Sequence, residues 1–139
     1  MRNSRVPAPA LALWVAVLAP VLVSCGSGDK APSDFCKSVA DLDSAVTQIN
    51  QSPLTKSTVT AVQDSVDQID AAAKNLTDTA GSQSPSEVAA VEADVTALDA
   101  SVAAAVDKPT PHNVDAARTS MRTLTTSVDD LATATSSSC

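Results

Sequence analysis

Apolar residues recur along this chain in alternating steps of three and four positions, in four separate segments. This spacing places the apolar side chains of a segment on one face of a helix, because an α-helix completes a turn in about 3.6 residues. The four apolar stripes are Phe35, Val39, Leu42, Val46 and Ile49; Val59, Val62, Val66, Ile69, Ala73 and Leu76; Val88, Val91, Val95, Leu98, Val102 and Ala105; and Val114, Ala117, Met121, Leu124, Val128 and Leu131. The sequence therefore predicts an all-α fold of four amphipathic helices.

Three of the four helices are expected to start where a hydroxyl residue precedes a proline. Ser52-Pro53, Ser84-Pro85 and Thr110-Pro111 each offer a side-chain oxygen for the N-cap and a proline for the first helical position. Ser33, which follows a proline, is the expected cap of the first helix. The predicted helices span residues 33–50, 53–78, 85–106 and 111–135.

Two further signals concern the turn between the second and third helices. Ser84 and Glu87 have the spacing of a capping box, in which each side chain satisfies the free backbone N–H of the other residue. Gly81 suits the position just past the end of the second helix. This turn and the other connections are short, so consecutive helices are expected to pack antiparallel, in an up-down-up-down four-helix bundle over residues 33–139.

The positions of two cysteines support an even number of helices. Cys36 lies in the first turn of the first helix, and Cys139 follows the fourth. Four antiparallel helices bring these residues to the same end of the bundle, whereas three would leave them roughly 25–30 Å apart at about 1.5 Å rise per residue. In an oxidising compartment the pair is expected to form a disulfide.

The first 24 residues have the three-part layout of an export signal. Arg2 and Arg5 precede an almost wholly apolar stretch over residues 6–23, and Leu22-Val23-Ser24-Cys25 closes it. The alternative is an uncleaved membrane-spanning helix of about 18 residues. Three prolines interrupt this stretch, which disfavours a continuous helix. Residues 1–24 are therefore expected to be a cleaved signal peptide.

The tetrapeptide 22–25 resembles the lipobox of bacterial lipoproteins, in which the cysteine receives a diacylglyceryl group before the signal peptidase cuts. The resemblance implies that Cys25 carries the lipid and begins the mature protein, which would then be held on the outer face of the cell membrane. Residues 25–32 include Gly26, Ser27 and Gly28 and are expected to form a flexible tether. The heavy use of Ala, Val, Asp, Ser and Thr is similar in style to small actinobacterial lipoproteins, including those of mycobacteria.

The charge of the predicted mature chain excludes one class of partner. The whole sequence has 9 basic and 16 acidic residues, and two of the basic residues lie in the predicted signal peptide. The remaining 7 basic and 16 acidic side chains give a formal charge of −9. Such a surface repels nucleic acids and anionic lipid headgroups, so binding to DNA or RNA is not expected.

No residue pattern in the mature chain predicts catalysis or a cofactor. His112 is the only histidine and is expected on the exposed first turn of the fourth helix. Met121 lies nine positions further on, which places it on the opposite face, so the two cannot ligate one haem iron. Asp64, Asp67 and Asp70 lack the spacing of a calcium-binding loop and are expected to form a solvated acidic face. The protein is therefore not expected to be an enzyme or to bind a metal.

Two functional hypotheses remain from the sequence. The first is a monomeric, membrane-anchored envelope lipoprotein that acts as a non-catalytic interaction or accessory module, with an envelope protein as partner. The alternative is a small carrier that shelters an apolar ligand, such as a lipid, between its helices. A carrier needs a cavity of about 300–1,000 Å³ lined by apolar residues. Dense packing of valine and alanine in the stripes predicts no such cavity.

Overall fold

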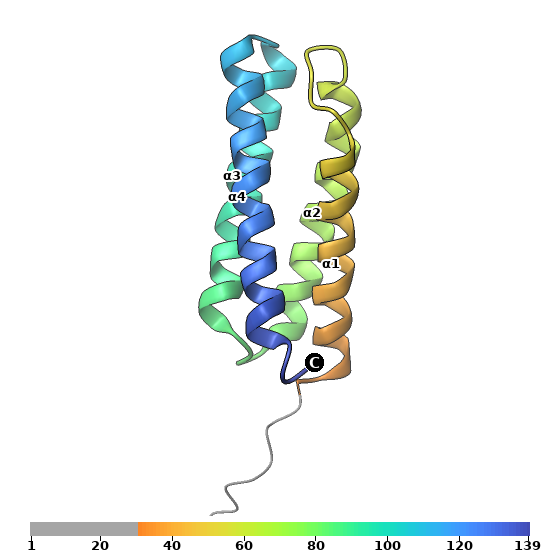
Figure 1. Ribbon diagram of the computed structural model, residues 1–139, viewed down its shortest axis with the longest axis vertical. Helices are drawn as coiled ribbons and strands as arrows, with labels where there is room; N and C mark the ends of the chain where they lie inside the picture. Colours follow the sequence, from red (N-terminus) through yellow and green to blue (C-terminus); the bar gives the residue numbers. More distant parts are fainter. Residues whose placement is uncertain (1–30) are drawn as a thin grey trace, which may run out of the picture.

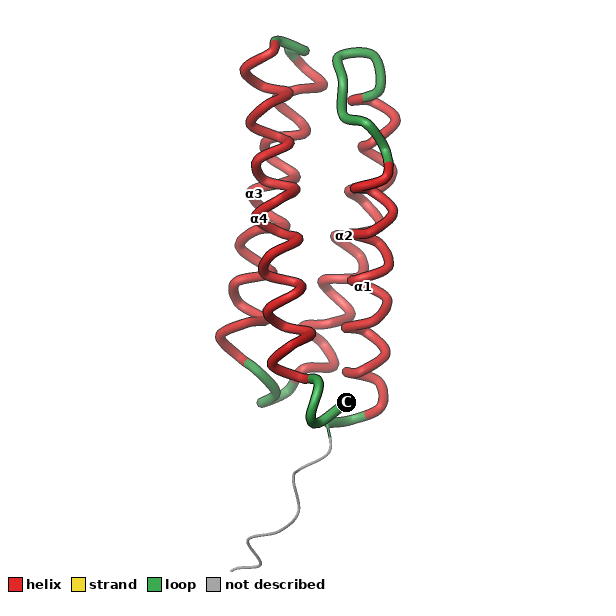
Figure 2. Tube along the Cα trace, in the orientation of Figure 1, coloured by secondary structure: helices red, strands yellow, loops and turns green. Residues whose placement is uncertain are grey.

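The computed structural model describes residues 31–139, and the predicted signal peptide and Cys25 lie outside the described residues. Within that range the chain forms four helices (Figure 1). They are α1 (Ser33–Gln51), α2 (Val59–Ala80), α3 (Pro85–Asp107) and α4 (Pro111–Thr135). Only turns and loops join them over the described residues (Figure 2). The prediction of an all-α, four-helix fold is confirmed.

The four apolar stripes form the core of the bundle. Every stripe residue is buried, as the periodicity predicts. Fully burying a leucine, isoleucine or phenylalanine side chain stabilises the folded state by roughly 1.5–3 kcal/mol relative to leaving it exposed. Three buried apolar residues of the described chain lie outside the stripes, and these are Ala31, Leu54 and Ala80. The core therefore extends into the segment before α1 and into the loop after it.

Each helix packs against two others, in the cyclic order α1, α2, α3, α4. Hydrogen bonds give the relative direction of the helices that flank α1. Thr79, near the end of α2, donates its hydroxyl to the Ser38 hydroxyl near the start of α1, over 3.1 Å. The backbone N–H of Ala31, just before α1, donates to the carbonyl of Ser138, just after α4, over 3.3 Å. Both α2 and α4 therefore run antiparallel to α1, as Figure 1 also shows.

The predicted start of the second helix at Pro53 is wrong, because α2 begins at Val59. Residues 52–58 instead form a loop that turns back over the end of the bundle. Leu54 is only 4% exposed, so burial of its side chain draws the loop into the core. Thr58 donates its hydroxyl to the Pro53 carbonyl and accepts from the Thr55 backbone N–H, which closes the turn. The bounds of the other three helices agree with prediction to within one residue.

The predicted capping box at the start of α3 is also wrong. Ser84 has a φ of 41°, in the left-handed region, and its side chain makes no capping hydrogen bond. Glu87 instead accepts a hydrogen bond from the Ser86 hydroxyl. Only residues 81–84 connect α2 to α3, and Gly81 also has a positive φ, of 55°. This short turn holds Ser84 away from the extended conformation that an N-cap requires.

The predicted N-cap residues of α1 and α4 have opposite outcomes. Ser33 lies inside α1, and Pro32 occupies the N-cap position without a side-chain hydrogen bond, so the predicted Ser33 cap is wrong. Thr110 does cap α4, because its hydroxyl accepts from the backbone N–H of Asn113 over 3.2 Å. An extended backbone at Thr110, with φ −80° and ψ 155°, permits this contact.

Alanine substitutions at Thr110 and Ser84 are expected to have different effects on stability. Thr110→Ala is expected to reduce the free energy of unfolding by about 1 kcal/mol, because it leaves the N-terminus of α4 without its side-chain acceptor. Ser84→Ala removes no capping hydrogen bond and is expected to change the free energy of unfolding by less than about 0.5 kcal/mol. Urea denaturation of the two variants measures the difference. Equal losses would show that Ser84 caps α3 after all.

Candidate functional site

The bundle has two ends, and one of them holds both predicted disulfide partners. We call this end the disulfide pole; it contains Cys36, Cys139 and the turn at residues 81–84. The structure places the two cysteines at disulfide-bonding distance, with their Cα atoms 5.5 Å apart across 103 positions of sequence. The Cys139 backbone N–H donates to the Thr135 carbonyl over 2.8 Å, which directs the chain after α4 toward α1. The juxtaposition predicted from the helix count is therefore present.

The described chain also begins at the disulfide pole. The Ala31 backbone N–H donates to the Ser138 carbonyl over 3.3 Å, and the Ala31 side chain is 6% exposed. Cys25 lies outside the described residues, six positions before Ala31. At about 3.5 Å per residue, a chain of that length spans at most roughly 21 Å. A lipid on Cys25 would therefore hold the disulfide pole within that distance of the membrane surface.

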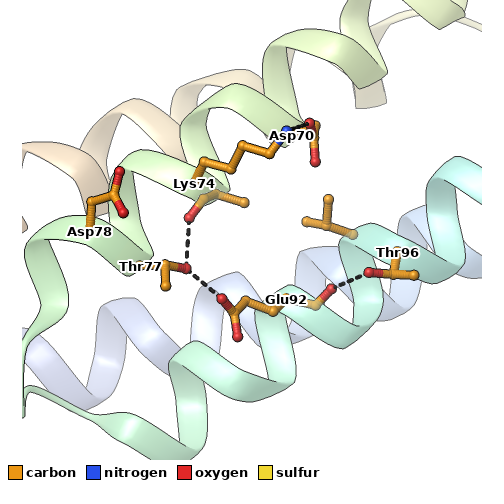
Figure 3. Close-up of a pocket in the computed structure, with 8 residues that line it drawn as sticks. Asp70, Lys74, Thr77, Asp78, Glu92 and Thr96 are labelled. Atoms are coloured by element: carbon orange, nitrogen blue, oxygen red, sulfur yellow. Dashed lines mark hydrogen bonds and ion pairs between the residues drawn. The ribbon is translucent and has the colours of Figure 1, made fainter.

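A groove of about 500 Å³ lies between α2 and α3 (Figure 3). Charged and hydroxyl side chains line most of it, with two stripe residues, Ala73 and Val95, among the lining. The Thr77 hydroxyl donates to a Glu92 carboxylate oxygen over 2.6 Å and links the two helices. The remaining lining residues are Asp70, Lys74, Asp78 and Thr96. Six of the eight lining residues are therefore charged or hydroxyl residues, and three of these six are acidic.

Lys74 is the one basic side chain in the lining of this groove, and Asp70 pairs with it. The ammonium lies 2.6 Å from the Asp70 carboxylate, in an i,i+4 arrangement on α2. The hydrogen bond to Asp70, together with the charge of that residue, raises the pKa of Lys74 above its ordinary value of 10.5. Lys74 therefore stays protonated near neutral pH and has no free electron pair for nucleophilic or base chemistry.

The residues weighed as haem or metal ligands do not converge. His112 is exposed on the first turn of α4, whereas Met121 is buried in the core. Asp70 pairs with Lys74 and does not join Asp64 and Asp67 in a metal site. Across residues 31–139, no three histidine, cysteine or acidic side chains gather closely enough to hold a metal ion.

Sequence analysis missed a contact at the opposite end, which we call the distal pole; it contains the loops at residues 52–58 and 108–110. Arg118 donates from Nε and Nη2 to the Leu54 carbonyl, over 3.1 and 2.6 Å. Its Nη1 atom donates to Asp115 over 2.8 Å. The sequence feature that could have indicated this contact is Leu54, an isolated leucine next to Pro53 and outside every stripe. The contact fixes the loop against α4 beside a second, smaller groove.

No protein family model, curated protein or solved structure matches this chain. In the part of the chain that the structure describes, none of the four helices combines the length and apolar character needed to cross a membrane.

Proposed function

We propose that this protein is an envelope lipoprotein, anchored by a lipid on Cys25, that acts as a non-catalytic interaction or accessory module outside the cytoplasm. Support for the anchor comes from Leu22-Val23-Ser24-Cys25, which closes an apolar segment that starts with two arginines. These features resemble a lipoprotein signal peptide with its lipobox.

The observation that carries the proposal is the position of Ala31 at the disulfide pole, beside Ser138. A tether that ends there attaches to a single end of the bundle. The opposite end, with the 52–58 and 108–110 loops, is then directed away from the membrane. A bundle oriented in this way leaves its distal pole and its helix faces accessible to a partner in the envelope.

The carrier alternative receives less support from the packing. All four stripes are buried in the core, and only two of the eight residues that line the groove between α2 and α3, Ala73 and Val95, are apolar. A lipid tail requires a predominantly apolar pocket. We therefore favour the interaction module and treat a bound lipid as the outcome that would replace it.

Substituting the predicted lipid attachment site tests the anchor. Cys25→Ala is expected to abolish lipidation, because alanine has no thiol to accept the diacylglyceryl group. The protein should then accumulate as an uncleaved precursor, and the mature, detergent-soluble form should disappear. Expression in an actinobacterial host, followed by Triton X-114 phase separation and immunoblotting, measures both effects.

The matched control is Cys36→Ala, which removes a different thiol and should leave the mature protein in the detergent phase. A Cys25→Ala protein that is still cleaved after Ser24 and still enters the detergent phase would overturn the lipid anchor.

The role as an interaction module is tested separately, by purification of the protein from envelope extracts after chemical crosslinking. The module predicts a specific crosslinked protein, whereas stoichiometric lipid without protein would favour the carrier.

A further inference from the structure

Charge is distributed unevenly along the bundle. Residues 50–64 and 104–122, which surround the distal pole, hold four basic and three acidic side chains. The rest of the described chain holds two basic and twelve acidic side chains. The four distal basic residues are Lys56, Lys108, Arg118 and Arg122. The distal pole is therefore the part of an otherwise acidic domain where an anionic group meets the least repulsion.

A small groove of about 190 Å³ opens at this pole, between the end of α1 and the first half of α4. Leu54 and Met121 are buried at the groove and give it apolar walls. Arg118 is held in place by the Leu54 carbonyl and the Asp115 carboxylate. The remaining lining residues are Asn50, Ser52, Pro53 and Arg122. The groove has room for a small polar group and too little volume for a drug-sized ligand.

Arg122 differs from the other basic residues on the helices. Lys37, Lys74 and Arg118 each pair with an acid three or four positions away. The positions three and four away from Arg122 hold Arg118 or threonines, so no acid lies within helical pairing distance. Over residues 31–139, no ion pair or side-chain hydrogen bond engages the Arg122 guanidinium. Its donors are free to bind an exogenous acceptor.

Two neutral donors line the groove with Arg122. The Ser52 hydroxyl makes no hydrogen bond to any other described residue. Asn50 uses one N–H of its side-chain amide for Thr125 and has a second available. A guanidinium beside hydroxyl and amide donors matches the planar oxygen pair of a carboxylate or the oxygens of a phosphate.

We propose that this distal groove binds a single oxyanion group, either a carboxylate or a phosphate, with Arg122 as its principal ligand and with Ser52 and Asn50 as additional donors. Arg118 also lines the groove, but its charge is balanced by Asp115, so Arg122 supplies the unpaired positive charge. Anion binding in this groove requires no membrane anchor, so its test does not depend on whether Cys25 carries a lipid. The same donors would bind a free small anion or an anionic group on a partner molecule, because both present the same oxygen acceptors.

Nuclear magnetic resonance titration tests the site directly. The probes are sodium acetate and inorganic phosphate, added to the ¹⁵N-labelled oxidised mature chain with Cys25→Ser, and sodium chloride at equal ionic strength is the reference. Saturable shifts are expected at the Arg122 Nε–H and at the backbone amides of Asn50 and Ser52. Arg122→Gln should weaken binding of the preferred anion at least about tenfold, because it removes a charge-assisted bidentate contact.

Lys74→Gln is the matched control, since it removes a positive charge from the groove between α2 and α3 and should leave the affinity unchanged. The Arg122→Gln spectrum must retain the dispersion of the unmodified protein, which shows that it is folded. A short peptide with a free carboxyl terminus that binds more tightly than acetate would place the anion on a partner, and equal affinity would indicate a free anion. Unsaturable shifts with both probes, or equal binding by Arg122→Gln, would overturn the proposal.

Discussion

Replacing Cys36 and Cys139 with serine is expected to lower the free energy of unfolding by about 2–4 kcal/mol. The two residues are 103 positions apart, so their disulfide would close a loop that contains nearly the whole domain. In the chain-entropy model a loop of about 100 residues restricts the unfolded state by roughly 4.7 kcal/mol, and measured effects are usually smaller. Urea denaturation of the oxidised protein and of the double-serine variant measures the loss.

Reduction provides the matched control for this experiment. The unmodified protein treated with a reductant should lose the same stability as the double-serine variant, while the reductant should leave the variant itself unchanged. Under oxidising conditions both single variants, Cys36→Ser and Cys139→Ser, should behave like the double variant, because either one breaks the bond. If reduction leaves the unfolding midpoint of the unmodified protein unchanged, the disulfide does not contribute to stability.

Phe35→Ala is expected to cost about 3–5 kcal/mol, the largest effect of any single core substitution. Phe35 is completely buried and is the only aromatic residue that follows Trp14 in the sequence. The surrounding core is rich in valine and alanine, whose short side chains cannot extend to fill the space that a phenyl ring vacates. A small domain has a typical total stability of about 5–15 kcal/mol, so this variant should be close to unfolding at 37 °C.

Phe35→Leu is the control for the same position, since leucine keeps most of the buried apolar surface. It is expected to cost less than half as much as alanine in urea denaturation. Circular dichroism at 10 °C should show a helical spectrum for both variants. A loss below about 1 kcal/mol for Phe35→Ala would mean that the first turn of α1 does not pack in the core, contrary to the structure.

Hydrophobic periodicity was sufficient to predict the number of helices and the stripe residues that form most of the core. Each stripe residue, from Phe35 to Leu131, is buried because a helix with one apolar face has a single way to remove that face from water. Val106 and Ala132, which lie just outside the stripes, are only partly buried. The approach of Cys36 to Cys139 could be predicted for the same reason, since it depends on the number of helices and on little else.

The ends of the helices were harder to predict, because local signals there compete with tertiary contacts. Ser52-Pro53 is a favourable helix start in isolation, but burial of Leu54 moves the start of α2 to Val59. Ser84 has the right neighbour for a capping box, but the short turn after α2 gives it a left-handed backbone. Neither effect can be predicted from residue spacing, because each depends on where the adjacent helix lies.

The distal groove could not be predicted from sequence either. It depends on the loop over residues 52–58 reaching Arg118, which lies 64 positions after Leu54. Arg122 alone resembles any exposed arginine, and the absence of an acid partner becomes informative only when the neighbouring donors are known. Sequence identified the acidic character of the mature chain but not the concentration of basic side chains at one end.

The most direct test of the central claim is an intact mass measurement on the protein purified with detergent from the envelope of an actinobacterial host. A lipid-anchored, disulfide-closed bundle predicts a chain that begins at Cys25, carries a diacylglyceryl group with or without further acylation, and gains two hydrogens per molecule on reduction. An unmodified chain that begins at Met1, or a cleaved chain whose Cys25 carries no lipid, would contradict the anchor and the orientation derived from it.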